Sequence, residues 1–94
     1  MRFARSAVRH GITEAQIRYI VELYGVADDV PLESNAAISG LLFVGDDQRA
    51  IALEIIGVMV RDGSGGEDLL VIHAMPLRRR YRPEYERVMR EKWG

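Results

Sequence analysis

The stretch "AIALEIIGVMV", residues Ala50–Val60, has the β-branched and aliphatic composition of a β-strand. Side chains of a strand alternate between its two faces, so Leu53 and Ile55 would lie on one face and Glu54 and Ile56 on the other. Both faces are therefore largely apolar. We expect this segment to be the central strand of a sheet that is covered on both sides.

Two further apolar runs flank this strand, "GLLFVG" at Gly40–Gly45 and "LLVIHAM" at Leu69–Met75. The connectors "DDQR" and "DGSGGED" are short and rich in turn residues, which is typical of hairpins between antiparallel strands. Residues 26–39, "VADDVPLESNAAIS", combine a proline with acids and small residues, and this composition predicts a loop. The sequence therefore predicts a three-stranded, or slightly larger, antiparallel sheet.

Two helices are expected before the strands. The first spans about Phe3–His10 and ends at Gly11, a residue that tolerates a left-handed backbone. The second begins with a capping-box pattern, Thr13 with Gln16, and ends at Gly25. Its apolar residues at helical spacing are Ile17, Ile20, Val21 and Tyr24. Together these segments predict an N-terminal helical hairpin.

A C-terminal helix is expected after the last strand. Pro83 suits the first turn of a helix, where its missing N–H costs nothing. The apolar stripe that follows consists of Tyr85, Val88, Met89 and Trp93. We therefore predict a single α+β domain over residues 1–94, with the helical hairpin on one face of the sheet. The opposite face would be a concave functional surface or the landing site of a partner.

The composition excludes several classes of protein. No cysteine is present, so a disulfide framework, a thiolate metal site and a cysteine nucleophile are excluded. No apolar segment has the length of a signal-peptide core or a membrane span, so we expect a cytoplasmic protein with no membrane partner. There is no P-loop, and His10 and His73 alone fall short of a typical metal-ligand set. We therefore expect neither a metal nor a cofactor.

The net charge of −1 hides an uneven distribution along the chain. Residues 13–75 hold eleven acids against three arginines, whereas residues 76–94 hold seven bases against three acids. The densest cluster consists of Arg78, Arg79, Arg80, Tyr81 and Arg82. Arginines and tyrosines at a junction between sheet and helix can contact phosphate and stack on bases, and Tyr85 would share a helical face with Tyr81. The alternative is a solvated charge run without a function.

Two polar residues lie inside the predicted strands. On strand alternation, His73 points to the same side as Val71, either as a partly buried histidine with a hydrogen-bonded ring or as a general acid or base. Glu54 is a carboxylate between apolar neighbours, which is costly unless the charge is paired. It would form a structural ion pair with Arg78 or Arg80, or act as a catalytic base.

The motifs "RHGIT", "GLLFVGDDQRAIALEIIGV" and "LLVIHAMPLRRRYRPEYER" together resemble the small BrnT-like toxins of bacterial toxin–antitoxin systems, which belong with the RelE-like ribonucleases. The resemblance spans about residues 9–87. It implies a RelE-like fold and a metal-independent endoribonuclease that inhibits translation by cleaving RNA. The implied partners are a cognate antitoxin protein and RNA, including ribosome-associated mRNA, with a homo-oligomer as an open alternative.

The resemblance also implies roles for individual residues. Arg78, Arg79 and Arg80 would hold phosphate, Tyr81 would stack or transfer a proton, and His73 or Glu54 would be the acid or base. The residues expected to contact the RNA are Arg49, Arg79, Arg82 and Tyr85.

A non-catalytic module is the rival interpretation. RNA affinity depends on neutralising phosphate charge, yet the middle of this chain is acidic. In this interpretation the Arg78–Arg82 cluster binds an acidic protein partner or a nucleic acid without turnover.

Overall fold

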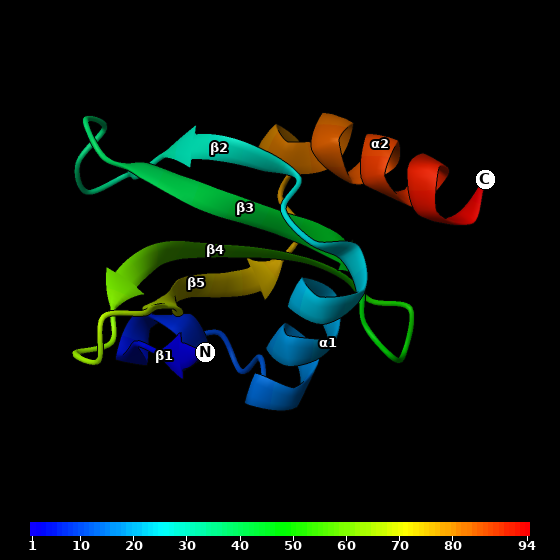
Figure 1. The fold of residues 1–94 in the computed structure, drawn as a ribbon. Coiled ribbons are helices and arrows are strands. Elements are labelled where there is room, and N and C mark those ends of the chain that lie inside the picture. The colour runs from blue at the N-terminus through cyan, green and yellow to red at the C-terminus, as the bar shows by residue number, and fades with distance from the viewer.

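A five-stranded mixed sheet forms the centre of the computed structural model, which describes residues 1–94 (Figure 1). The elements are β1 Arg2–Phe3, the 3-10 turn η1 Arg5–Val8, α1 Glu14–Tyr24, β2 Asp28–Pro31, β3 Ser39–Asp46, β4 Ala52–Arg61, β5 Glu67–Pro76, the 3-10 turn η2 Arg79–Tyr81 and α2 Arg82–Trp93. The strand order is β1-β5-β4-β3-β2, and only β1 and β5 run parallel. The α+β class is confirmed. Neither α1 nor α2 has the length and apolar character of a transmembrane helix.

The central position of β4 confirms the prediction made for Ala50–Val60. β4 pairs with β3 on one side and β5 on the other, and residues 53–57 are buried. Leu53 and Ile55 pack in the core beneath α1, whereas Ile56 belongs to a second cluster on the opposite face. Glu54 lies on that second face, because side chains alternate along a strand.

α1 covers one face of the sheet, as expected. The Thr13 hydroxyl accepts from the Gln16 N–H at 3.1 Å and the Gln16 side chain accepts from the Thr13 N–H at 2.8 Å, so the predicted capping box is present. Gly25 ends the helix with a φ of 72°, in the region that favours glycine. The buried cluster on this face consists of Ala7, Ile12, Ile17, Ile20, Phe43, Leu53, Ile55, Val71 and Ala74.

The predicted helix at Phe3–His10, and with it the N-terminal helical hairpin, is wrong. Residues Arg2–Phe3 form β1, parallel to β5, and only one 3-10 turn, Arg5–Val8, follows. An isolated helix of this length is marginal, because nucleation fixes several residues for one hydrogen bond. The edge of β5 offers better partners: the Ala4 N–H donates to the Val71 carbonyl at 2.9 Å.

The loop predicted over residues 26–39 is also wrong in part. Asp28–Pro31 forms β2, which pairs antiparallel with β3 and buries Val30. Two acids and a proline are poor strand formers but are typical of a protected sheet edge, so the segment had no visible strand signal. The predicted antiparallel sheet of three or slightly more strands is therefore corrected to a five-stranded mixed one.

The C-terminal helix is confirmed as α2, with Pro83 in its first turn. Figure 1 shows α2 beside β2 and β3, on the other side of the sheet from α1. The second buried cluster consists of Val30, Leu42, Val44, Ile56, Tyr81 and Val88. α2 packs mainly against β3, and the polar side chains described next lie on the same face of the sheet over β4 and β5, beside Ile56.

An irregularity between β4 and β5 decides where His73 points. Ile56 pairs with His73 and Gly57 pairs with Val71, so Ile72 is an extra residue in β5. A bulge of this kind reverses the alternation beyond it. Val71 packs beneath α1, whereas His73 lies on the opposite face, with Glu54. The expectation that His73 points to the same side as Val71 is therefore wrong.

Candidate functional site

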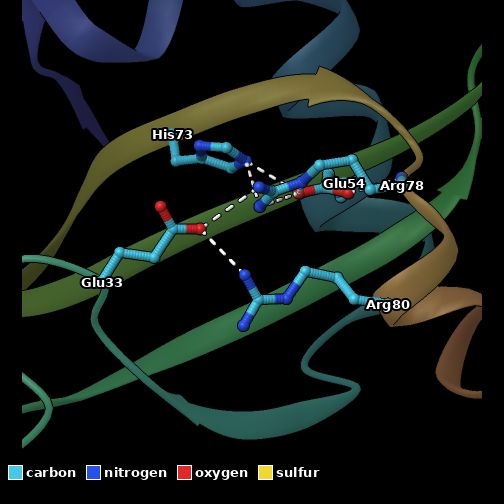
Figure 2. Close-up of polar contacts among 5 residues, drawn as sticks. All are labelled: Glu33, Glu54, His73, Arg78 and Arg80. Atoms are coloured by element: carbon cyan, nitrogen blue, oxygen red, sulfur yellow. Dashed lines mark hydrogen bonds and ion pairs between the residues drawn. The ribbon is translucent and has the colours of Figure 1, made fainter.

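Glu54 forms the centre of a polar cluster on the face away from α1 (Figure 2). Its carboxylate is 0% exposed and accepts three kinds of contact. The Arg78 backbone N–H donates to Oε1 at 2.7 Å, Arg78 Nε donates to Oε2 at 2.8 Å, and His73 Nε2 lies 2.8 Å from Oε2. The predicted ion pair of Glu54 is therefore made with Arg78, whose Nη2 is 2.7 Å from Oε2, and not with Arg80.

These contacts keep Glu54 ionised. Burial alone would raise the pKa of Glu54, but hydrogen bonds from His73 and Arg78 outweigh it and hold the pKa below its ordinary value. In return, the hydrogen bond to Glu54 raises the pKa of Arg78. A carboxylate held ionised by so many donors is a poor proton acceptor near pH 7, so Glu54 is suited to positioning its neighbours.

His73 is oriented by this carboxylate. An ionised carboxylate only accepts hydrogen bonds, so Nε2 of His73 carries the proton that Glu54 binds. Arg78 Nη2 also lies 3.4 Å from Nε2, but both are donors that share Glu54. Nδ1 makes no hydrogen bond, and the side chain is 21% exposed. The ring is therefore held at Nε2 and free at Nδ1. This is the arrangement of a general base oriented by a carboxylate.

The turn after β5 brings Arg78 to this position. Pro76 ends the strand, and the Leu77 N–H donates to the Ala52 carbonyl at 3.0 Å, at the start of β4. The next N–H, that of Arg78, is then aimed at Glu54. Hydrogen bonds from the backbone N–H groups of Leu77 and Arg78 to β4 thus hold Arg78 beside Glu54, in addition to the contacts of its side chain.

Glu33 joins the cluster from the loop between β2 and β3 (Figure 2). Its Oε1 accepts from Arg78 Nη1 at 3.2 Å and from Arg80 Nη1 at 3.1 Å. Its side chain is 61% exposed, so each contact contributes little to stability. Sequence reasoning missed Glu33, because it lies in the segment taken for a plain loop and no local signal marks it.

Tyr81 is part of the core. The residue is 5% exposed, and burial raises the pKa of its phenol. The guanidinium carbons of Arg78 and Arg80 lie 5.7 and 5.1 Å from the ring centroid, within range of cation–π attraction. With so little of the residue exposed, the ring offers little surface on which a nucleobase could stack, and the stacking and proton-transfer roles of Tyr81 stay predictions.

A cationic pocket of about 440 Å³ lies where β5 passes into α2. Arg79 and Arg82 line it, are exposed and form no ion pair. Tyr85 also lines it, and its hydroxyl donates to Asp46 Oδ1 at 2.5 Å. Burial and that carboxylate raise the pKa of Tyr85 to about 12. The expected phosphate-contacting residues Arg79, Arg82 and Tyr85 therefore do come together.

Arg49 lies apart from both groups. It lines a pocket beside the start of α1, with Thr13, Gln16 and Asp47 among its neighbours. That pocket shares no residue with the pockets of His73 or Arg79. The structure therefore gives no support to joining Arg49 with the other predicted site residues.

Another pocket, of about 370 Å³, lies beside His73 and is lined by Ser6, Arg9, Leu32, Glu33, Ser34, Ile56, Ile72 and His73. The His10 ring lies edge-on to the His73 ring, with 6.4 Å between centroids. Sequence reasoning assigned His10 to the end of a helix and did not include Arg9 in the site. The signal that could have identified them was the "RH" pair itself, since His10 is the only other imidazole in the chain.

No three His, Asp or Glu side chains are grouped so as to hold a metal ion. One connected cluster consists of Glu54, His73 and Arg78, and Arg80 joins it through Glu33. A neighbouring group consists of Arg79 and Arg82.

No protein-family model, curated protein or solved structure matches this chain, so its resemblance to BrnT-like and RelE-like toxins stays a prediction.

Proposed function

We propose that this protein is a metal-independent endoribonuclease in which His73 takes the proton from a ribose 2′-hydroxyl. The observation that carries the proposal is the hydrogen bond from His73 Nε2 to buried Glu54, which leaves Nδ1 free beside a pocket. Glu54 orients the ring and stabilises the imidazolium that forms when Nδ1 accepts a proton. General-base catalysis needs such a group within hydrogen-bond reach of the proton it removes.

The reaction that fits this site is attack of the 2′-oxygen on the adjacent phosphorus. The bond from phosphorus to the 5′-oxygen breaks, which leaves a 2′,3′-cyclic phosphate and a 5′-hydroxyl. Arg9 lines the pocket and can offset the charge on the phosphate. Arg78 is held by Glu54 and Glu33, so its role is to position Glu54 and His73.

The biological setting we propose is that of a toxin held inactive by a cognate antitoxin protein, with ribosome-associated mRNA as the RNA substrate. It rests on the motif resemblance. Expression in a bacterium should then arrest growth, and His73→Gln should relieve the arrest at equal protein level.

The biochemical test is cleavage of a labelled RNA oligonucleotide in the presence of a chelator. The wild type should release products with 2′,3′-cyclic phosphate ends, and His73→Gln should lower the rate about 100-fold or more, as for loss of a general base. A 2′-deoxy substitution at the cleaved position should block the reaction. Intact RNA with the folded wild type would refute the proposal.

A second candidate is supported by the exposed, unpaired Arg79 and Arg82 beside Tyr85. These side chains form a cationic pocket suited to binding a nucleic acid, or an acidic protein partner, without cutting. In that case RNA stays intact but binds, and the double variant Arg79→Ala, Arg82→Ala weakens binding and lowers its salt dependence. If the ribonuclease proposal is correct, the same double variant still cleaves, whereas His73→Gln does not.

A further inference from the structure

His10 is held next to His73 by the segment that replaces the expected helix. The Ala4 N–H donates to the Val71 carbonyl at 2.9 Å, and Ser6 Oγ donates to the Ile72 carbonyl at 2.5 Å. Both contacts are with the bulged part of β5, directly before His73. The N-terminal segment is therefore tied to the strand that carries the proposed base.

Buried residues before and after His10 in the sequence also fix its position. Ala7 and Ile12 are buried in the core, at 0% and 8% exposure, so the residues between them form a short bridge over the surface. Gly11, with a φ of 78°, turns the chain back into the core. His10 itself is exposed and makes no hydrogen bond, and its ring lies edge-on to His73 at 6.4 Å. Packing thus places the ring without occupying either nitrogen.

Cleavage by a 2′-hydroxyl needs a second proton transfer, because the 5′-oxygen leaves poorly as an alkoxide. The charged groups around His73 are Glu54 and Arg78, which touch it, and Arg9 and Glu33 at the pocket. Glu54 is held ionised and so has no proton to give, and arginines do not lose theirs. Exposed Glu33 is bound to Arg78 and Arg80.

We infer that His10 is the general acid of this site and protonates the departing 5′-oxygen. The inference rests on the proposed function, in which His73 is the base. In the reaction, His73 Nδ1 gains the proton of the 2′-hydroxyl while the 2′-oxygen bonds to phosphorus. The bond to the 5′-oxygen breaks, and that oxygen takes a proton from the His10 imidazolium. Exchange with water then restores both rings.

The test compares two RNA substrates, one with an ordinary 5′-oxygen and one with sulfur in that bridging position. A thiolate leaves without a proton, so the sulfur substrate does not need an acid. His10→Gln should lower kcat/KM on ordinary RNA about 100-fold and should cleave the sulfur substrate nearly as fast as the wild type does. His73→Gln should be slow on both. Arg5→Gln, an exposed change in the same turn, should match the wild type on both.

The pH dependence of kcat/KM supplies a second readout. The wild type should show a fall at low pH, where the base is protonated, and a fall at high pH, where the acid is deprotonated. His10→Gln should lose the high-pH fall. Thermal melting should show that the variant is folded.

The outcomes separate the two proposals. Equal activity of His10→Gln and wild type on ordinary RNA overturns the role of His10 and leaves the ribonuclease proposal standing. An equal loss on both substrates also overturns it. A wild type that cleaves neither substrate overturns the proposed function and this inference with it.

Discussion

Arg78 binds Glu54 through its backbone N–H, 2.7 Å from Oε1, and through its guanidinium, whose Nε and Nη2 lie 2.8 and 2.7 Å from Oε2. The backbone contact determines where the chain leaves β5, and the guanidinium pairs with a carboxylate that has no access to water. One residue therefore joins the central strand to the turn that precedes α2. This relationship makes the cluster a structural element as well as a candidate site.

Glu54→Gln should destabilise the fold. It removes the buried charge of the pair and leaves the Arg78 guanidinium with only the exposed Glu33 as an acidic partner, which should lower the free energy of unfolding by about 3 kcal/mol. Glu33→Gln is the matched control, because it makes the same chemical change at an exposed partner of the same arginine and should cost only about 0.5 kcal/mol. Urea unfolding of the three proteins measures the difference. Equal midpoints would contradict the structural role of the pair.

The lowered pKa of Glu54 predicts acid sensitivity. A carboxyl group whose pKa is lower in the folded than in the unfolded protein stabilises the fold at pH values above its ordinary 4.5, and this contribution is lost as the pH falls through the folded pKa. Below pH 4.5, the free energy of unfolding of the wild type should therefore fall more steeply with decreasing pH than that of Glu54→Gln. Urea midpoints across the acid range would show it, and parallel curves would count against it.

Glu33 should compete with anionic ligands. Its carboxylate occupies the position between Arg78 and Arg80 that a phosphate would take, so Glu33→Gln should free Arg80 and tighten RNA binding about threefold at low salt. Fluorescence anisotropy with a labelled RNA, in the catalytically impaired His73→Gln background, measures this. The gain should vanish at high salt. Glu91→Gln, which removes the partner of Arg87 on α2, should leave affinity unchanged.

Tyr85 should titrate about two pH units above an ordinary tyrosine, since burial and Asp46 raise its pKa to about 12. Because the folded pKa exceeds the unfolded one, the contribution of the neutral phenol is complete below pH 10 and is lost as the pH rises toward 12. Ultraviolet absorbance of the phenolate measures the titration. Tyr85→Phe should remove the late-titrating component, and its persistence in that variant would assign it to another tyrosine.

Two helices and the central strand, whose signals lie within a few residues, were predicted correctly. The capping box of Thr13 and Gln16 and the first-turn Pro83 marked α1 and α2, and the apolar run around Leu53 marked the central strand. An ion pair of Glu54 with Arg78 or Arg80 was one of the two roles expected for this carboxylate, because a charge in a two-sided apolar strand requires a partner, and the structure makes it with Arg78. These inferences need only the residue itself and its near neighbours in sequence.

Only the tertiary structure decided the rest. β1 and β2 form because β5 and β3 present open edges to segments with little strand propensity of their own. The bulge at Ile72 turns His73 toward Glu54, and it depends on a register between strands that no local pattern records. Glu33 and His10 reach the cluster from segments far away in sequence, because hydrogen bonds to β3 and β5 hold those segments in place. The sequence by itself determined which groups carry charge and where local helices and strands begin, whereas long-range backbone pairing decided which of those groups meet.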